Sequence, residues 1–472
     1  MVGIKSFGTY IPFYRLSRGE LARAWAKRSA EGQKAVACYD EDSITMAVGA
    51  GLDCLKGLNS QTVEGLFLAT TTFPYKEKQA ASIVATALNC PPEIYTADVG
   101  NSLRAGTTAI NFALDAIQSG RARNIIVAAS DDRQGAPRGE FESLLGDGAA
   151  ALLFSDSEVV ASVEGSYSLT NELLDVWRAD KDTYIRSWED RFVITQGYKR
   201  IVGETVRGLL NKYKLIPEDF AKVILYAPDT KSYSSLAKTL GFDPKTQLQD
   251  SLIGVIGNTG VASPLIMLVA ALEEAKSGDR ILFASYGDGS DAFILKVTED
   301  IDKLRDGRGI SKYLQSETVQ INYEKYLLWR GHIDAELPRR PEPLVPSPAA
   351  LLRERRRILA LQGQKCKRCG TAQYPPKRIC VQCQTKDEFD DYMFSDKKAK
   401  VFTYSSDYIT GTVESPIIMC IIDFEGGGRM ETELADPGSI EIEIGQPVEM
   451  TFRKLQNAKG IHHYFWKCKP IR

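Results

Sequence analysis

Four cysteines near the C-terminal end of the chain have the spacing of metal ligands. They form two Cys-x-x-Cys pairs separated by ten residues, namely Cys366 with Cys369 and Cys380 with Cys383. Two such pairs can present four thiolates as a tetrahedron, which is the arrangement of a closed structural Zn²⁺ site in a zinc ribbon. Disulfide pairing is the alternative, and a reducing cytosolic compartment disfavours it. Four protein ligands leave no open position for water, so we expect a structural metal rather than a catalytic one.

A basic stretch surrounds these cysteines, and Glu354 is the one acidic residue within it. Its members are Arg353, Arg355, Arg356, Arg357, Lys365, Lys367, Arg368, Lys377 and Arg378. One interpretation is that they offset the negative charge of a thiolate-bound zinc ion and coat a solvated helix. The other is a landing surface for a phosphorylated ligand such as coenzyme A, with Arg368 as one contact.

The histidines exclude several common mechanisms from the first two thirds of the chain. The three histidines are His332, His462 and His463, so residues 1–331 contain none. Catalysis by a Ser-His or Cys-His pair is therefore excluded there, unless a histidine arrives from the C-terminal region or a partner. The same region has three cysteines, Cys38, Cys54 and Cys90, and we expect each to be a buried structural residue.

Length and charge limit the class of protein. The chain has 472 residues, with 59 basic and 61 acidic side chains and a net charge of −2, so at least two domains are expected. The balanced charge argues against a dedicated nucleic-acid binder. We find no apolar run long enough to span a bilayer and no secretory signal, and expect a cytoplasmic protein.

Residues 1–298 alternate buried strands with helical stretches, which predicts an α/β fold with a largely parallel sheet. An internal repeat suggests how that fold is built. QSGRARNIIVAAS (118–130) and the later GDGAAALLF (146–154) return in the same order within KSGDRILFASYGDGSDAFIL (276–295). The repeat predicts a duplicated domain with halves of about 1–160 and 161–300 and a helical tail that ends at residue 331.

The remainder of the chain has a different character. Residues 332–350 contain a proline-rich linker, ELPRRPEPLVPSPAA. Residues 351–397 are predicted to hold a short basic helix and the zinc ribbon. From residue 398 to 472 the pattern becomes short β segments with glycine turns, which predicts a small OB-fold β-barrel.

The motifs of the first 300 residues resemble a known family in their order. They are YDEDSITMAV (39–48), RAGTTAI (104–110), GDGAAALL (146–153), DVWR (175–178), IGNTGVASPL (256–265) and GDRILFASYGDGSDAF (278–293). This part of the chain is similar to 3-hydroxy-3-methylglutaryl-CoA synthases of the archaeal and bacterial type, in the thiolase superfamily. The resemblance implies a duplicated five-layered αβαβα fold. Residues 351–472 resemble the zinc-ribbon and OB-fold module (DUF35 type) that accompanies such enzymes as a separate subunit.

The resemblance also assigns the family's three catalytic positions. The acid/base glutamate corresponds to Thr71, the acyl-accepting cysteine to Leu103, and the histidine to Tyr226. A shift of one residue would place Ser102 at the nucleophile position. The family's asparagine is retained as Asn258, and a lysine that would contact coenzyme A is retained as Lys231.

These assignments favour a catalytically degenerate subunit of an acyl-CoA acyltransferase complex with Claisen or thiolytic chemistry. In this hypothesis the zinc-ribbon and OB-fold module docks a thiolase-type subunit that brings the nucleophilic cysteine, and the resemblance implies a homodimer of the large domain, hence a hetero-oligomer. The alternative is an active enzyme of altered chemistry, with Tyr226 as acid and Ser102 as nucleophile. Its candidate bases are Asp131, Asp132 and Glu140. A third possibility is a ligand-binding or scaffolding protein.

Overall fold

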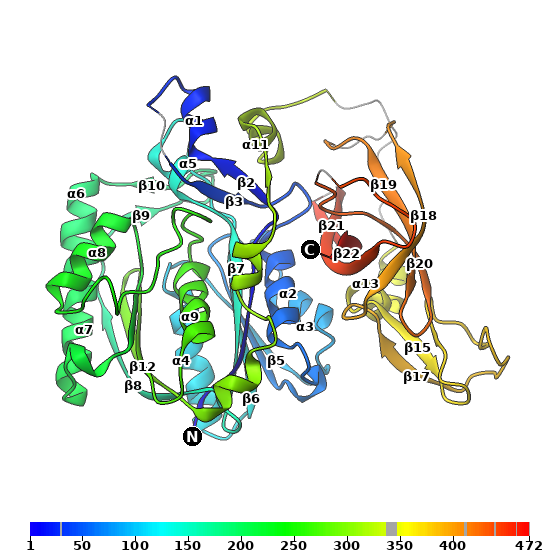
Figure 1. Cartoon of the computed structure of the whole chain (residues 1–472), viewed down its shortest axis with the longest axis horizontal. Helices are drawn as coiled ribbons and strands as arrows, with labels where there is room; N and C mark the ends of the chain where they lie inside the picture. The colour runs from blue at the N-terminus through cyan, green and yellow to red at the C-terminus, as the bar shows by residue number, and fades with distance from the viewer. Residues whose placement is uncertain (29–30, 337–346, 410–412, 439, 459, 472) are drawn as a thin grey trace.

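The structure of the chain is a computed structural model that describes residues 1–28, 31–336, 347–409, 413–438, 440–458 and 460–471 (Figure 1). Residues 337–346 of the predicted linker lie outside the described residues. Among the described residues no helix is both long and apolar enough to cross a membrane.

A nine-stranded sheet forms the framework of the large domain, in the order β11-β12-β13-β8-β1-β7-β6-β4-β5. The strands are β1 (Gly3–Tyr10), β4 (Gly65–Ala69), β5 (Tyr95–Val99), β6 (Asn124–Asp131), β7 (Gly148–Ser155), β8 (Ala161–Thr170), β11 (Lys222–Leu225), β12 (Arg280–Tyr286) and β13 (Gly289–Val297). In each half a parallel pair, β4 with β6 or β11 with β12, continues into an antiparallel strand, β7 or β13. The two halves meet through a short pairing between β1 and β8.

Helices cover both halves of the sheet and fill the space between them (Figure 1). Helices α4 (Ala105–Gln118) and α9 (Ala262–Glu274) form the central layer. Helices α2 (Ser43–Cys54) and α3 (Ala81–Ala87) cover one outer face, and α7 (Arg200–Tyr213) and α8 (Thr230–Thr239) cover the other. Helix α9 is apolar on nearly all sides, as a helix packed between two sheets must be. The predicted five-layered αβαβα fold is confirmed. The prediction of a largely parallel sheet is wrong, because β1, β7, β8 and β13 pair with their neighbours in antiparallel orientation and only β4–β5, β4–β6 and β11–β12 are parallel among the described strand pairs of this sheet.

The two Gly-Asp-Gly turns explain the sequence repeat, because each closes on the start of the other half's central helix. Gly146 donates its backbone N–H to Asn258 O, just before α9. Gly287 lies against the segment before α4, where an added Cβ would be 2.9 Å from the backbone nitrogens of Leu103 and Arg104. The close approach requires glycine at both turns, and it ties the halves together around their central helices.

An excursion between β8 and α7 lies over the ends of the central helices. It contains β9 (Val176–Trp177), β10 (Arg186–Ser187), α6 (Asp190–Phe192) and a π-helical turn, η2 (Val193–Lys199). We call residues 171–199 the roof. A small sheet, β14-β2-β3, lies beside it, with β2 (Tyr14–Ser17), β3 (Gln33–Val36) and β14 (Val319–Gln320). Helices α1 (Arg18–Ala24), α5 (Glu140–Leu144) and α11 (Tyr323–Trp329) complete this end of the domain. Helix α10 (Ser311–Gln315) instead contacts Glu273, near the C-terminal end of α9.

The C-terminal part begins with two short helices, α12 (Pro348–Arg353) and α13 (Arg355–Leu359). The zinc ribbon follows as the sheet β16-β15-β17, made of β15 (Gln362–Cys366), β16 (Ala372–Gln373) and β17 (Phe389–Met393). The last five strands form the sheet β20-β19-β18-β21-β22, with β18 (Ala399–Asp407), β19 (Ile417–Phe424), β20 (Arg429–Glu433), β21 (Pro447–Ala458) and β22 (Ile461–Pro470). A bridge from Leu434 to Cys468 nearly closes this OB-type barrel.

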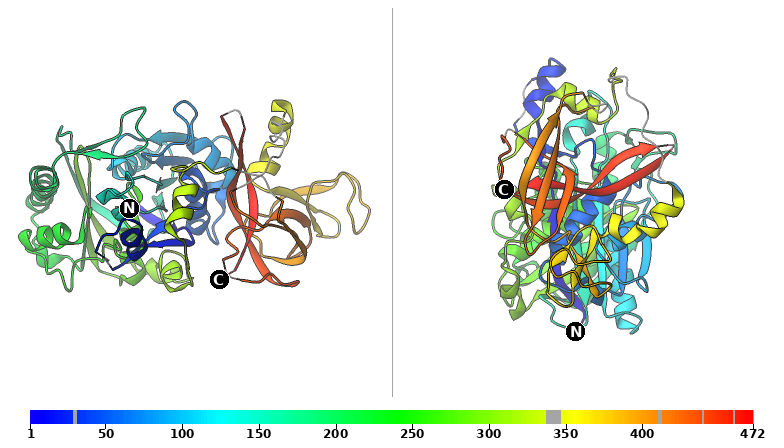
Figure 2. Two further views of the ribbon diagram at one scale, coloured as in Figure 1. Left: turned by 90° about the horizontal axis from the view of Figure 1, so that it is seen from above. Right: turned by 90° about the vertical axis from the view of Figure 1, so that its right-hand side faces the viewer.

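The barrel packs against the α2–α3 face of its own large domain, on one side of the molecule (Figure 2). One apolar cluster runs across the contact and includes Val48 and Val84 from the large domain and Ile422 and Trp466 from the barrel. The predicted α/β domain, zinc ribbon and OB-fold barrel are therefore all present, and the C-terminal module is anchored on the same chain.

Buried charges hold this contact. Arg453 of β21 has no exposed surface and pairs with Asp40 and Glu41 at 3.1 Å each, and with Asp436. Lys467 of β22 pairs with Asp40 at 2.9 Å. The Tyr464 hydroxyl donates to Asp42, which also caps the N-terminus of α2. We call Asp40, Glu41, Asp436, Arg453 and Lys467 the anchor cluster.

Candidate functional site

A cavity of about 1220 Å³ lies beneath the roof, at the meeting point of the two halves. Thr71, Ser102, Leu103, Tyr226 and Asn258, which are separate in the sequence, all line it. They come from the loop after β4, the start of α4, the end of β11 and the segment before α9. The fold therefore brings the three catalytic positions assigned from the resemblance, together with Asn258, to one place.

The start of α4 lies at the cavity wall, where backbone N–H groups and the helix dipole favour negative charge. Leu103 lines the cavity there, together with Asn101 and Ser102. The neighbouring Ser102 hydroxyl accepts a weak hydrogen bond of 3.4 Å from the backbone N–H of Arg104. Among the described residues no side chain lies within hydrogen-bond distance of that hydroxyl, so Ser102 has no base to activate it.

Tyr226 and Asn258 form a bonded pair. The Asn258 amide donates to the Tyr226 hydroxyl and to the Ala227 carbonyl, both at 3.1 Å, and its oxygen accepts from Gly260 N–H at 2.9 Å. The amide is thereby saturated, so Asn258 positions Tyr226 and has no donor left for a ligand. Burial raises the pKa of Tyr226, partly offset by the charge of Arg133, so its hydroxyl keeps its proton.

Asp131 is a buried carboxylate that ties the cavity wall together. It accepts hydrogen bonds from Thr70, Thr71 and Thr72, and from the backbone N–H of Val261 at the start of α9. Burial raises the pKa of this carboxyl. Because both oxygens already accept hydrogen bonds within the protein, we assign Asp131 a structural role rather than that of a general base.

Three tyrosines, none of which except Tyr226 stood out in the sequence, pack together in the cavity wall. The ring centres of Tyr198 and Tyr286 lie 5.8 Å apart, and each lies about 6 Å from that of Tyr226. The Tyr286 hydroxyl donates to Asp175, a residue of the DVWR motif in the roof. The Tyr198 hydroxyl is buried and has no partner among the described residues.

No cysteine or histidine is among the described residues that line the cavity. Cys38, Cys54 and Cys90 are buried elsewhere, as predicted, and burial raises the pKa of Cys54 and of Cys90 to about 12. Two histidines contact neighbouring parts of the molecule: the His332 ring lies 3.1 Å from the hydroxyl of Tyr184 in the roof. His462 of the barrel donates its backbone N–H to the hydroxyl of Tyr75, which lines the cavity.

The other candidate residues are spread around the site. Glu140 lies at the rim, where a hydrogen bond with Asp190 raises its pKa. Asp132 is not among the residues that line the cavity, and its backbone N–H donates to Thr72. Lys231 is exposed near the start of α8, and Arg368 is exposed in the zinc ribbon, and neither lines the cavity.

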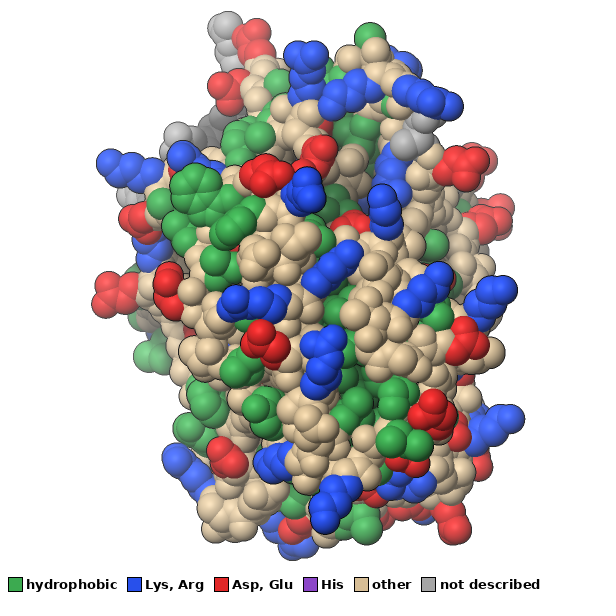
Figure 3. Space-filling model, turned by 90° about the vertical axis from the view of Figure 1, so that its left-hand side faces the viewer, with side chains coloured by type: hydrophobic (Ala, Val, Ile, Leu, Met, Phe, Trp, Pro, Cys, Tyr) green, Lys and Arg blue, Asp and Glu red, His purple; other side chains and the backbone are tan. Residues whose placement is uncertain are grey.

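The outer face of α7 and α8 is basic (Figure 3). These two helices carry five basic side chains and one acidic one: Arg200, Arg207, Lys212, Lys231 and Lys238 against Glu204. Lys231 thus belongs to a basic surface outside the cavity.

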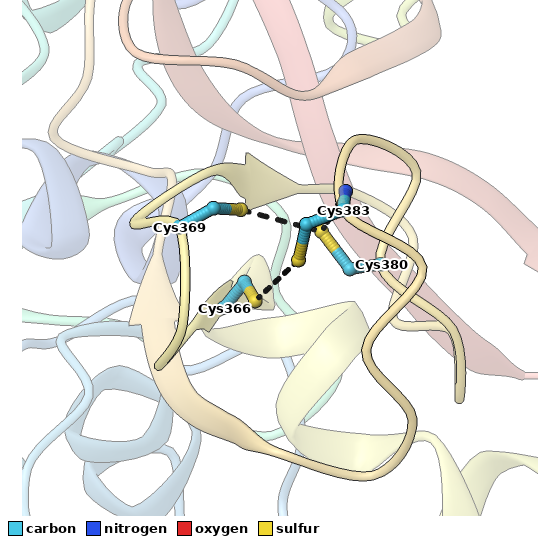
Figure 4. Close-up of side chains that lie close together, drawn as sticks. All are labelled: Cys366, Cys369, Cys380 and Cys383. Atoms are coloured by element: carbon cyan, nitrogen blue, oxygen red, sulfur yellow. Dashed lines mark hydrogen bonds between the residues drawn. The ribbon is translucent and has the colours of Figure 1, made fainter.

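The four predicted ligand cysteines converge in the zinc ribbon (Figure 4). All four sulfurs lie within 4.8 Å of one another, and two of the distances between them are 3.6 Å. Such spacings are those of thiolates around one ion with bonds of about 2.3 Å, and are far too long for a disulfide. The backbone N–H of Gln382 and the hydroxyls of Thr371 and Thr385 contact the sulfurs and help to disperse their charge. The donor set fits Zn²⁺.

The basic stretch around the zinc ribbon is more fully paired than the sequence suggested. Glu354 is not its one acidic neighbour, because β17 and the loop before it supply three more, in the pairs Lys367–Asp390, Arg378–Asp387 and Arg356–Asp391. Arg355 contacts Thr86 of α3. These contacts favour the interpretation that the stretch supports the fold.

Comparison with known domain families gives matches in three segments. Residues 210–296 match the C-terminal part of 3-oxoacyl-[acyl-carrier-protein] synthase III. Residues 353–389 match the rubredoxin-like zinc ribbon domain of ChsH2, and residues 394–453 match the C-terminal OB-fold domain of ChsH2.

Curated relatives of the large domain are described as hydroxymethylglutaryl-CoA synthases. The protein from Methanocaldococcus jannaschii is 33% identical over 344 residues, which cover 71% of this chain and 99% of the relative. The protein from Methanopyrus kandleri is 32% identical over 336 residues, which cover 69% of this chain and 96% of the relative.

Solved structures share the fold. MvaS in complex with 3-hydroxy-3-methylglutaryl coenzyme A matches with a TM-score of 0.63 and 20% identity, covering 74% of this chain and 94% of that protein. An HMG-CoA synthase complexed with CoA matches with a TM-score of 0.61 and 20% identity, covering 69% and 89%.

Proposed function

Because the chain belongs to the hydroxymethylglutaryl-CoA synthase family, we propose that its large domain binds an acyl-CoA in the cavity beneath the roof without itself becoming acylated. In this proposal the chain is a non-catalytic subunit of an acyl-CoA acyltransferase complex. A thiolase-type partner supplies the cysteine that carries the acyl group, and the complex makes or breaks a carbon–carbon bond beside the thioester.

The observation that carries the proposal is the composition of the cavity wall. A leucine, Leu103, lies at the start of α4, where the helix dipole would stabilise a thiolate. No cysteine or histidine is among the described residues that line the cavity. Ser102, the remaining candidate nucleophile of an active enzyme, has no base within hydrogen-bond distance among the described residues. An active synthase using that serine is therefore less well supported.

Coenzyme A is the ligand best supported for the cavity. A related solved structure is described as a complex with CoA, and another as a complex with a CoA thioester. The cavity of about 1220 Å³ has room for an acyl group with its pantetheine arm. The basic face of α7 and α8, which includes Lys231, offers charges for the phosphates outside it.

The partner would meet the side of the C-terminal module that faces away from its own large domain. In the zinc ribbon, Ile379 and Val381 expose 55% and 71% of their surface and are candidates for this contact. The large domain would form a homodimer through β5, which is an edge strand of the nine-stranded sheet.

Three measurements test the proposal: ligand binding, thiolysis and affinity purification. The purified chain should bind acetyl-CoA but should not cleave acetoacetyl-CoA in the presence of CoA. Affinity purification of the tagged chain from its own host should recover a thiolase-type protein, and Val381→Asp should reduce that recovery while leaving CoA binding intact. Thiolysis by the chain alone, or recovery without any thiolase-type protein, would contradict it.

A further inference from the structure

The loop that follows β4 forms part of the cavity rim and has little structure of its own. We call residues 71–76 the rim loop, and four of its six residues line the cavity: Thr71, Phe73, Tyr75 and Lys76. The rim loop belongs to no helix or strand. Its backbone makes no hydrogen bond with another backbone group of the described residues. A loop of this kind keeps one shape only if contacts from outside hold it.

The large domain holds the two ends of the rim loop. Ser43 of α2 and Arg178 of the roof donate to the backbone carbonyls of its first two residues, at 2.8 and 2.6 Å. At the other end Lys76 pairs with Asp180 of the roof, but both side chains are largely exposed, so the pair contributes little. Among the described residues, no hydrogen bond from the large domain reaches residues 73–75.

The barrel contacts the rim loop at this central part. His462 of β22 donates its backbone N–H to the Tyr75 hydroxyl at 2.7 Å, and the two rings meet edge to face with their centres 5.0 Å apart. Burial and the charge of Lys454 lower the pKa of His462, whereas a hydrogen bond with the backbone of Pro74 raises it. His462 is not among the residues that line the cavity, so its effect on a ligand there would pass through the rim loop.

The two strands on either side of this contact are themselves fixed to the large domain. Tyr464 of β22 donates its hydroxyl to Asp42 at 2.7 Å, and Lys454 of β21 donates its backbone N–H to the Asp40 carbonyl at 2.9 Å. Asp42 caps the N-terminus of α2, where Ser43 holds the rim loop. The barrel, the start of α2 and the rim loop are therefore joined by one continuous set of contacts.

We propose that the OB-fold barrel completes the acyl-CoA site of its own large domain, with His462 as a positioning residue that holds Tyr75 and the rim loop in place. The inference rests on the proposed function, since it takes acyl-CoA as the ligand of the cavity. A contact that only attached the barrel would not need to reach the cavity lining, because the anchor cluster already fixes the barrel to the large domain. Coupling between two sites is reciprocal, so ligand binding must also tighten the contact between β22 and the rim loop.

Calorimetric titration of the full chain with acetyl-CoA tests the positioning role. Tyr75→Phe removes the acceptor of the His462 N–H, and His462→Ala removes the ring that meets Tyr75. We expect each variant to bind acetyl-CoA about two- to tenfold more weakly, as the loss of one hydrogen bond or one ring contact does. His462→Phe keeps a flat ring against Tyr75 and should restore part of the affinity.

His463→Ala is the matched control. It removes the same kind of side chain from the next position of β22, where alternation along the strand directs the side chain to the opposite face. We expect this variant to bind acetyl-CoA as the wild-type chain does.

Hydrogen–deuterium exchange of the wild-type chain tests the same coupling without a variant. Acetyl-CoA should slow exchange in the rim loop and at the start of β22, where the His462 amide donates to Tyr75. Strand β17 of the zinc ribbon should exchange at an unchanged rate. In Tyr75→Phe, acetyl-CoA should no longer slow exchange at the start of β22.

The outcomes separate this inference from the proposed function. Wild-type affinity in both Tyr75→Phe and His462→Ala, an equal loss in His462→Ala and His463→Ala, or exchange at β22 that acetyl-CoA leaves unchanged would overturn the positioning role while CoA binding stands. Failure of the wild-type chain to bind either CoA or acetyl-CoA would overturn both proposals.

Discussion

At the scale of single residues, the proposed loss of acyl transfer depends on a residue just before α4. Leu103 lines the cavity where the helix dipole would lower the pKa of a thiol. We predict that Leu103→Cys becomes acylated by acetyl-CoA, because the position supplies the electrostatics and lacks the sulfur. Intact mass measured before and after incubation, followed by peptide mapping, checks this.

Ser102→Cys is the matched control, because it tests whether the family's cysteine corresponds to residue 102 or to residue 103. It adds the same thiol one residue earlier, and we expect it to react at least tenfold more slowly. Faster acylation of Ser102→Cys would show that the nucleophile position is residue 102 rather than residue 103.

The resemblance to the synthase family located more residues of this site than the local sequence pattern around each residue did. Thr71, Leu103, Tyr226 and Asn258 lie in motifs that keep their order, so their convergence could be foreseen. Arg133 and Tyr198 could not, because an arginine after two aspartates is typical of a solvated turn. It is nevertheless buried, against Gly260 at the start of α9, which is distant in sequence. Whether the replaced positions make the chain inactive remains a prediction.

At the scale of elements, strands β21 and β22 are fixed to the start of α2 by the anchor cluster. Arg453→Met would leave the buried carboxylates of Asp40, Glu41 and Asp436 without their main counter-charge. We predict that the free energy needed to separate β22 from α2 falls by about 3–5 kcal/mol. Hydrogen–deuterium exchange of these two elements measures it.

Arg429→Met is the control for the anchor cluster, because Arg429 forms an exposed pair with Asp423 in the same barrel. Its loss should cost about 0–1 kcal/mol. Equal effects of the two variants would mean that the anchor cluster contributes nothing specific to the contact.

Glu41 gives the same contact a dependence on pH. Burial, opposed by Arg453, raises its pKa to about 7. Because the folded state binds the proton of Glu41 more tightly than the unfolded chain does, this carboxyl stabilises the folded state at low pH. The stabilisation is complete when the pH is below the ordinary pKa of a glutamate, and it is lost as the pH rises through about 7. Glu41→Gln removes the contribution, so the melting temperature of the variant minus that of the wild type should increase between about pH 5 and about pH 8. A difference that is constant or decreases would refute this.

The elements themselves were largely predictable, and their mutual contact was not. Alternating apolar runs and the repeated Gly-Asp-Gly turns indicated the duplicated α/β domain, because each half must bury the same kinds of surface. The acidic run of residues 40–42 carried no such signal. Acidic runs are usually solvated, and this one is buried only because Arg453 and Lys467, some 400 residues later, fold against it.

At the scale of the whole molecule, the zinc ribbon braces the barrel, which in turn contacts the cavity wall through His462 and Tyr75. Phe394, at the end of the ribbon, packs on Phe424 of the barrel with ring centres 4.8 Å apart. We predict about one zinc per chain by metal analysis. Cys366→Ser should lower the zinc content and increase proteolysis after residue 350, while the circular dichroism of the large domain persists. Unchanged zinc content would contradict the four-thiolate site.

We propose that the large domain can hold an acyl-CoA but cannot accept its acyl group. The most direct test is the intact mass of the wild-type chain, purified alone, after incubation with acetyl-CoA and rapid acid quenching. We expect the unmodified mass, under conditions in which Leu103→Cys gains one acetyl group. A stable acetyl adduct on any residue between 1 and 331 of the wild-type chain would contradict it.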